Sequence, residues 1–118
     1  MRINAIWYPV ARWDEAKRFY GELLGLRQSS CNDEMGWAVF DVGSDLPFFL
    51  VKRPDRAGVP GGAVATFACE HLDSMVDRLL DVGIDIKETT PPGDAVRIFS
   101  VQDPDGNLLE LVQITAVA

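Results

Sequence analysis

The sequence has few of the side chains that bind transition metals or form disulfides. Its 118 residues include one histidine, His71, and two cysteines, Cys31 and Cys69. The cysteines are isolated and lack the spacing of a zinc or redox motif, so we interpret them as small hydrophobic residues. With one histidine and no Gly-x-Ser-x-Gly segment, the sequence gives no support to nucleophilic catalysis.

Basic residues are also scarce, because 11 Lys and Arg stand against 18 Asp and Glu and the formal net charge is −7. Nucleic acids and anionic membrane surfaces attract a surplus of positive charge, so neither is expected as a partner. No apolar run approaches the roughly 20 residues that span a bilayer, and the first residues have no signal-peptide pattern. We therefore expect a cytoplasmic protein without a membrane segment.

What remains is the composition of one folded domain over residues 1–118, with 47% hydrophobic and 25% charged residues. Its hydrophobic pattern occurs twice, and a Pro- and Gly-rich linker over 53–62 separates the two copies. In each copy a strand precedes a helix with apolar residues at helical spacing, and three strands follow. The expected helices cover 13–24 and 72–82, and the expected strands cover 1–10, 27–31, 37–42, 46–52, 63–69, 85–88, 95–101 and 108–114.

This repeat predicts an α+β fold made of two βαβββ units in tandem, unit one over about residues 1–55 and unit two over about 62–118. Two such units would form a cupped eight-stranded mixed sheet with the helices on its outer face. The most informative segment lies at the end of unit two. There a turn over 103–107 leads into an apolar strand that contains one carboxylate, Glu110, which is costly to bury without a partner.

Two segments carry a resemblance to a known family. Ala16–Leu26 has the sequence AKRFYGELLGL, and Asp103–Leu111 has the sequence DPDGNLLEL. These segments match the patterns A-x-x-FY-x-x-x-LGL and DPDGN-x-x-E-L of the glyoxalase/bleomycin resistance protein/extradiol dioxygenase family, the vicinal oxygen chelate superfamily. The resemblance covers essentially the whole chain. It implies the fold more than the reaction, since this family includes isomerases, lyases, dioxygenases, antibiotic-modifying enzymes and metal-free antibiotic-binding proteins.

The resemblance also implies a homodimer and a set of positions for metal ligands. In metal-dependent members a divalent ion is held by His and Glu side chains on the first and last strands of the two units. Counted from the matched segments, these positions are Ala5, Phe49, Val64 and Glu110. Three of the four side chains cannot coordinate an ion, and the internal repeat gives the same pairing of positions. We therefore expect neither a metal nor another cofactor.

Aromatic residues are expected around these positions. Trp7 lies two residues after Ala5 and therefore on the same strand face. Trp37 and Phe99 lie on strands that would form the walls of a site. An apolar lining with a few polar groups is typical of small-molecule sites, although these residues could simply fill the core. The predicted ligand-binding residues are Trp7, Trp37, Phe49, Val64, Arg97, Phe99 and Glu110.

The polar candidates have alternative interpretations. Glu110 is expected either to contact a polar or cationic ligand or to pair with a nearby arginine or water, and Arg97 on the preceding strand is a candidate partner. Arg97 could instead engage a ligand carboxylate or remain a solvated cation. His71 lies just before the second helix, several residues beyond the ligand position, so we interpret it as a surface residue.

The leading hypothesis is a metal-free protein that binds a small aromatic or apolar molecule, as in antibiotic sequestration. The negative net charge modestly favours cationic ligands. The rival hypothesis is a lyase, isomerase or dioxygenase-like enzyme, with an unusual metal site or with Glu110 as a general base. A regulatory or assembly module without a ligand is the third possibility. The sequence leaves open whether any reaction is catalysed.

Overall fold

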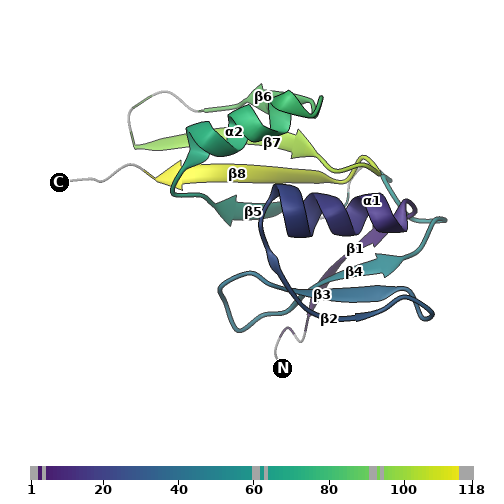
Figure 1. The fold of residues 1–118 in the computed structure, drawn as a ribbon. Helices are drawn as coiled ribbons and strands as arrows, with labels where there is room; N and C mark the ends of the chain where they lie inside the picture. Colours follow the sequence, from purple (N-terminus) through teal and green to yellow (C-terminus); the bar gives the residue numbers. More distant parts are fainter. Residues whose placement is uncertain are drawn as a thin grey trace. The chain divides into compact units, whose positions relative to one another are not determined.

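A computed structural model describes Ile3, residues 5–59, Gly62, residues 64–90, Gly93 and residues 95–114 (Figure 1). Its elements follow the predicted order, and most of their ends are shifted. The first half contains β1 (Ile6–Val10), α1 (Trp13–Arg18), the π-helical turn η1 (Phe19–Leu23), β2 (Arg27–Asn32), β3 (Trp37–Asp41) and β4 (Phe48–Lys52). The second half contains β5 (Ala65–Ala68), α2 (Leu72–Asp81), β6 (Ile86–Glu88), β7 (Val96–Gln102) and β8 (Leu108–Ile114). Parts of two expected strands, at residues 1, 2, 4 and 63, lie outside the described residues.

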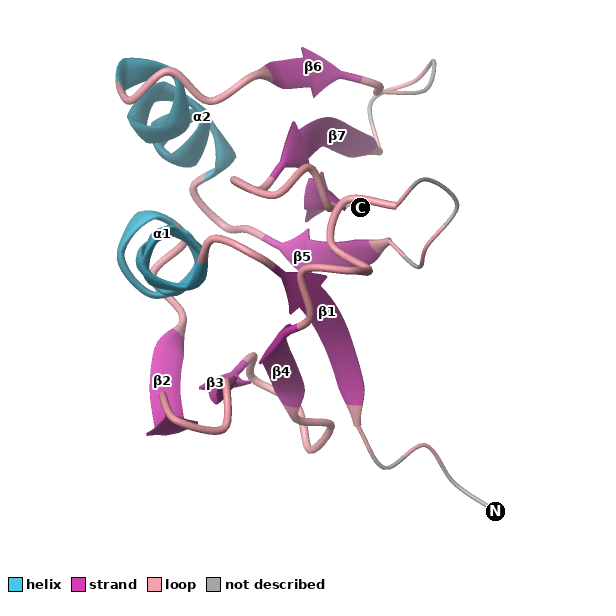
Figure 2. Cartoon of the chain, turned by 90° about the vertical axis from the view of Figure 1, so that its right-hand side faces the viewer, coloured by secondary structure: helices cyan, strands magenta, loops and turns pink. Residues whose placement is uncertain are grey.

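The eight strands form two four-stranded mixed sheets, which confirms the α+β fold class (Figure 2). The strand orders are β1-β4-β3-β2 and β5-β8-β7-β6. In each sheet the first strand pairs parallel with the last, and the other pairs are antiparallel. Hydrogen bonds therefore link strands within each βαβββ unit, where we had expected a single eight-stranded sheet. By their contacts the two units are Met1–Pro60 with Pro104–Asn107, and Gly61–Asp103 with Leu108–Ala118.

In unit 1 the helical segment covers one face of the sheet. Phe19 and Tyr20 are buried, and the Tyr20 ring lies 5.5 Å from that of Phe48 and 6.3 Å from that of Phe40. Tyr8 continues this cluster, at 5.4 Å from Phe48. Burying each large apolar side chain stabilises the fold by about 1.5–3 kcal/mol. We call this side of the sheet the helix face of unit 1.

In unit 2 the buried residues of the sheet and of α2 form a second core. Leu72 and Leu79 of α2 are fully buried, as are Val101 of β7 and Leu109 of β8. Helix α2 contacts β6 and β8. These buried residues define the helix face of unit 2. In the described part of the chain, no helix is long and apolar enough to cross a membrane.

The turn at Pro104–Asn107 belongs to unit 1, although it follows β7 in the sequence. Its Asp105 carboxylate accepts hydrogen bonds from the backbone N–H of Arg12, at 3.0 and 3.3 Å. The Asn107 side chain donates to the Pro9 carbonyl at 2.8 Å and accepts from the Gly58 N–H at 3.3 Å. The Pro104–Asn107 turn therefore contacts the end of β1, the start of α1 and the turn after β4.

Candidate functional site

The side of the unit 1 sheet opposite its helix face carries an aromatic cluster. Side chains alternate along a strand, so Trp7 of β1 and Phe49 of β4 point away from the buried Tyr8 and Leu50. Trp7 and Phe49 are direct partners across the parallel β1–β4 pair. The Trp37 ring of β3 lies 6.3 Å from the Phe49 ring, tilted by 58°. We call Trp7, Trp37 and Phe49 the aromatic face of unit 1.

A cation borders this aromatic face. The Arg56 guanidinium lies over the Trp7 ring, 5.3 Å from its centroid, and comes from the turn after β4. Arg56 is exposed, and Trp7 is 37% exposed. A guanidinium stacked on an indole is attracted by the electron-rich ring face, while the N–H groups at its edge remain able to donate hydrogen bonds. The aromatic face therefore combines flat apolar surface with positive charge at one edge.

In unit 2 the side of the sheet opposite the helix face carries Glu110. The Thr66 hydroxyl of β5 donates to a Glu110 oxygen at 3.0 Å, and these two residues are direct strand partners. Ser100 of β7 is the partner of Glu110 on its other side. Val64 lies two residues before Thr66, therefore on the same side, and is 43% exposed. We call Val64, Thr66, Ser100 and Glu110 the Glu110 face.

Arg97 and Phe99 lie on the other side of this sheet from Glu110. Phe99 is the strand partner of Leu111, which is buried in the helix face. Arg97 donates to Asp73 of α2 at 2.8 Å, and its guanidinium lies 5.5 Å over the Phe99 ring. Of the alternatives left open for Arg97, pairing with Glu110 is therefore contradicted. The register places Arg97 opposite Gln113, so strand alternation directs it toward the helix.

The four metal-ligand positions thus fall on two faces, each described within its own unit. Ala5 and Phe49 belong to unit 1, and Val64 and Glu110 belong to unit 2. Among the described residues there is no group of three or more His, Cys, Asp or Glu side chains that could hold a metal ion. His71 is exposed at the start of α2, where its carbonyl accepts the Met75 N–H at 3.1 Å.

A polar cluster of unit 1 lies on α1 and at the β2–β3 turn. One Asp33 oxygen accepts from the Trp13 indole N–H and the Lys17 ammonium, each at 2.7 Å, and from the Cys31 thiol at 3.4 Å. These donors, Lys17 first, lower the pKa of Asp33 from 3.8 to about 2. Burial and the bond to Asp33 raise the pKa of the Cys31 thiol, which disfavours a reactive thiolate. We interpret this cluster as structural.

Three residues of the two candidate faces are absent from the predicted ligand-binding set: Thr66, Ser100 and Arg56. Ser100 depends on the register between β7 and β8, which the sequence does not give. Thr66 had a detectable signal, because it lies two residues after the Val64 ligand position and so shares its strand face. Arg56 had none. It lies in the Pro- and Gly-rich linker, and nothing in the linker's composition shows that its turn brings this side chain over Trp7.

Comparisons with known proteins agree with this fold. The uncharacterized protein YraH of Bacillus subtilis (strain 168) is 27% identical over 130 residues, covering 97% of this chain and 99% of YraH. Among solved structures, the glyoxalase/bleomycin resistance protein of Catenulispora acidiphila DSM 44928 aligns with a TM-score of 0.73 at 25% identity, covering 93% of this chain and 96% of that one. TnmS3, an antibiotic binding protein from Streptomyces sp. CB03234, aligns with a TM-score of 0.75 at 24% identity, covering 98% and 97% of the two chains.

The sequence also matches a family over residues 2–111, nearly its full length. The match covers unit 1 and most of unit 2, and it includes the two segments that carried the resemblance. This chain therefore belongs to the Glyoxalase/Bleomycin resistance protein/Dioxygenase superfamily.

Proposed function

We propose that this protein is a metal-free member of the superfamily that binds a small aromatic molecule. The observation that carries the proposal is the replacement of metal ligands by apolar residues, above all Phe49 at the carboxylate position of unit 1. Phe49 pairs with Trp7 across β1 and β4 and lies 6.3 Å from Trp37. A position that would bind an ion in a metal-dependent member is here the centre of an aromatic cluster.

The physical chemistry of such a cluster supports a planar ligand. Ring pairs in offset or edge-to-face contact contribute about 0.5–1.5 kcal/mol beyond the burial of their area. Small-molecule sites are mostly apolar with a few placed polar groups, which matches an aromatic face bordered by one guanidinium. TnmS3 is described as an antibiotic binding protein, which supports a binding role for this fold.

Isothermal titration calorimetry with indole-3-acetamide, a neutral planar probe, tests the proposal. Because leucine keeps the apolar character but removes the ring, Trp7→Leu and Phe49→Leu are each expected to weaken binding about fivefold. Leu80→Ala is the control, since Leu80 is an apolar residue of α2 with 54% exposure and belongs to neither candidate face. Affinity that stays unchanged in both Trp7→Leu and Phe49→Leu would contradict ring binding on this face.

The metal-free part of the proposal is tested separately, by elemental analysis of protein purified from its own host without chelators. We expect far less than one divalent ion per chain. A stoichiometric ion would contradict this part, whatever the result with the aromatic probe.

A further inference from the structure

The guanidinium of Arg56 stands out among the charged groups of unit 1. In the described part of the chain, no hydrogen bond or ion pair involves this guanidinium, and its ring contact is with Trp7 at 5.3 Å. The adjacent Asp55 carboxylate interacts with the charge of Arg56 through space, but its hydrogen bonds come from Arg53. Its two oxygens accept from Arg53 at 3.2 and 3.1 Å, and this bond lowers the pKa of Asp55. The positive charge of Arg56 is therefore available beside the aromatic face.

We propose that Arg56 selects an anionic aromatic ligand, one whose ring stacks on the aromatic face of unit 1 and whose carboxylate or similar oxyanion binds the guanidinium. This inference rests on the proposed function and names the ligand class of the same face. It reverses the preference for cations that the net charge of −7 suggests. A guanidinium beside the ring site would act on a bound ligand at short range, whereas salt screens the diffuse negative charge of the protein over about 10 Å.

The geometry of a guanidinium explains why it suits this role. The guanidinium lies over the Trp7 ring, 5.3 Å from its centroid, and this cation–π contact keeps it beside the ring site. Its edge carries N–H donors that match the two oxygens of a carboxylate, and such charge-assisted pairs are stronger than neutral hydrogen bonds. A cationic ligand at the same place would meet like charge and would have to displace Arg56 from Trp7.

Three indole probes with different charge test the inference by calorimetry: indole-3-acetate, indole-3-acetamide and tryptamine. The unaltered protein is expected to bind indole-3-acetate about tenfold more tightly than the amide, with tryptamine the weakest. In Arg56→Gln the ratio of acetate to amide affinity should fall below about twofold. Arg56→Lys, which retains charge without the planar fork, should give an intermediate preference.

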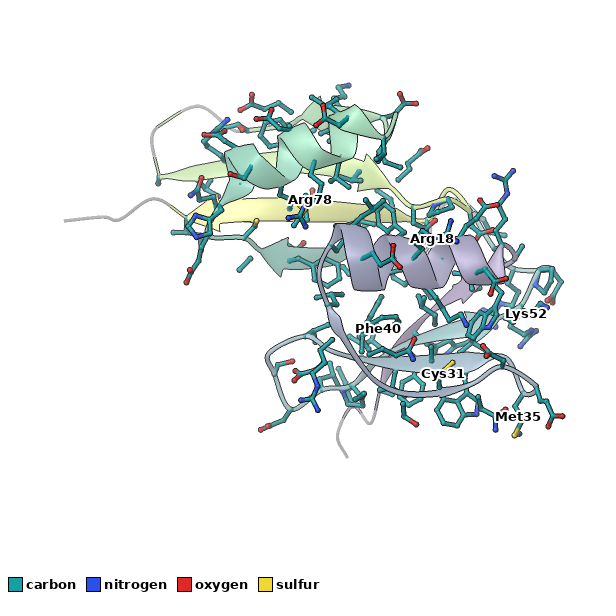
Figure 3. All side chains as sticks on the ribbon, in the orientation of Figure 1. Arg18, Cys31, Met35, Phe40, Lys52 and Arg78 are labelled. Atoms are coloured by element: carbon teal, nitrogen blue, oxygen red, sulfur yellow. The ribbon has the colours of Figure 1, made fainter. Side chains whose placement is uncertain are left out.

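Arg18→Gln is the matched control, because Arg18 is an exposed arginine on α1 (Figure 3). It changes the net charge equally and should leave the tenfold preference intact. Added salt at about 0.5 M should reduce the preference, since an exposed ion pair is screened. Circular dichroism of each variant establishes that it is folded.

The two proposals fail in different ways. If the amide binds and depends on Trp7, but the acetate is not preferred or its preference survives Arg56→Gln, the role of Arg56 is overturned and ring binding stands. Tightest binding of tryptamine would also overturn it. If none of the three probes binds, ring binding and the role of Arg56 are both overturned.

Discussion

At Asp33 one carboxylate oxygen links helix α1 to the end of strand β2. Trp13 and Lys17 donate to it from the helix, and Cys31 donates from the strand. All three donors favour the ionised carboxylate, and the pKa of Asp33 falls to about 2 as a result. Protonation of Asp33 therefore weakens the bonds that hold these two elements together.

This pKa predicts how stability depends on pH. Because the folded-state pKa is about 2 and the ordinary value is 3.8, the contribution of Asp33 is complete above pH 3.8 and is lost as pH falls through 2. Urea unfolding between pH 5 and 2 measures the free energy of unfolding of the unaltered protein and of Asp33→Asn. The variant should be less stable at pH 5, and this difference in the free energy of unfolding should narrow as the pH falls. Asp45→Asn, which removes an exposed carboxylate of the same unit, should show a smaller difference at pH 5. A constant difference for Asp33→Asn would contradict the prediction.

Substitution of Glu110 distinguishes two hypotheses: a protein that only binds its ligand, and an enzyme that removes a C–H proton. The Glu110 carboxylate is partly exposed and accepts from the Thr66 hydroxyl at 3.0 Å. A positioned general base contributes about 10²–10⁴-fold to proton transfer. If the protein only binds its ligand, exchange of the C–H protons of hydroxyacetone in D₂O, followed by NMR, should be equal for the unaltered protein and Glu110→Gln. Fast exchange that falls at least about 100-fold in Glu110→Gln would favour the enzyme.

At the scale of the elements, two turns of unit 1 meet at Gly58. This glycine, in the turn after β4, lies close to the backbone of Asp105 in the Pro104–Asn107 turn. Its φ is +67°, and a Cβ at this position would overlap the Asp105 carbonyl oxygen. Gly58→Ala should therefore destabilise the protein by about 2–4 kcal/mol, from backbone strain and steric overlap together. Chemical unfolding measures this loss.

Gly43→Ala separates the two causes. Gly43 has a φ of +77° and no atom within 4 Å of a built Cβ, so its substitution adds backbone strain without overlap. We expect it to cost about 1–2 kcal/mol. An equal loss for Gly58→Ala and Gly43→Ala would show that the contact with Asp105 does not matter for stability.

The register between β7 and β8 marks the limit of prediction from sequence. Strand periodicity located both strands, and for β8 it gave the ends found in the structure, 108–114. Which residues face Glu110 depends on how many residues the turn after β7 takes up, and a shift of one residue moves every side chain to the other face. The structure pairs Ser100 with Glu110 and Arg97 with Gln113, so Arg97, a candidate partner of Glu110, lies on the helix face.

For the whole molecule, the two units share a fold but have diverged in their exposed chemistry. Equivalent strand pairs carry Trp7 with Phe49 in unit 1 and Thr66 with Glu110 in unit 2. Helical and strand periodicity predicted the repeated fold because both units use the same apolar pattern to build their cores. The residue types alone distinguish the two faces, but the position of Arg56 over Trp7 could not be predicted without the path of the linker turn.

This divergence predicts how the stability of the whole protein responds to metal ions. A site with a Kd near 1 μM would stabilise the fold by about 4.1 kcal/mol at about 1 mM ion, which corresponds to a rise in Tm of roughly 10 °C or more. Since Glu110 is the single ligating side chain among Ala5, Phe49, Val64 and Glu110, about 1 mM Zn²⁺ or Ni²⁺ should raise Tm by less than about 2 °C. Thermal unfolding of the unaltered protein, Glu110→Ala and His71→Gln checks this. A large rise that disappears in Glu110→Ala would establish a metal site at Glu110, whereas a rise lost only in His71→Gln would reflect a surface histidine.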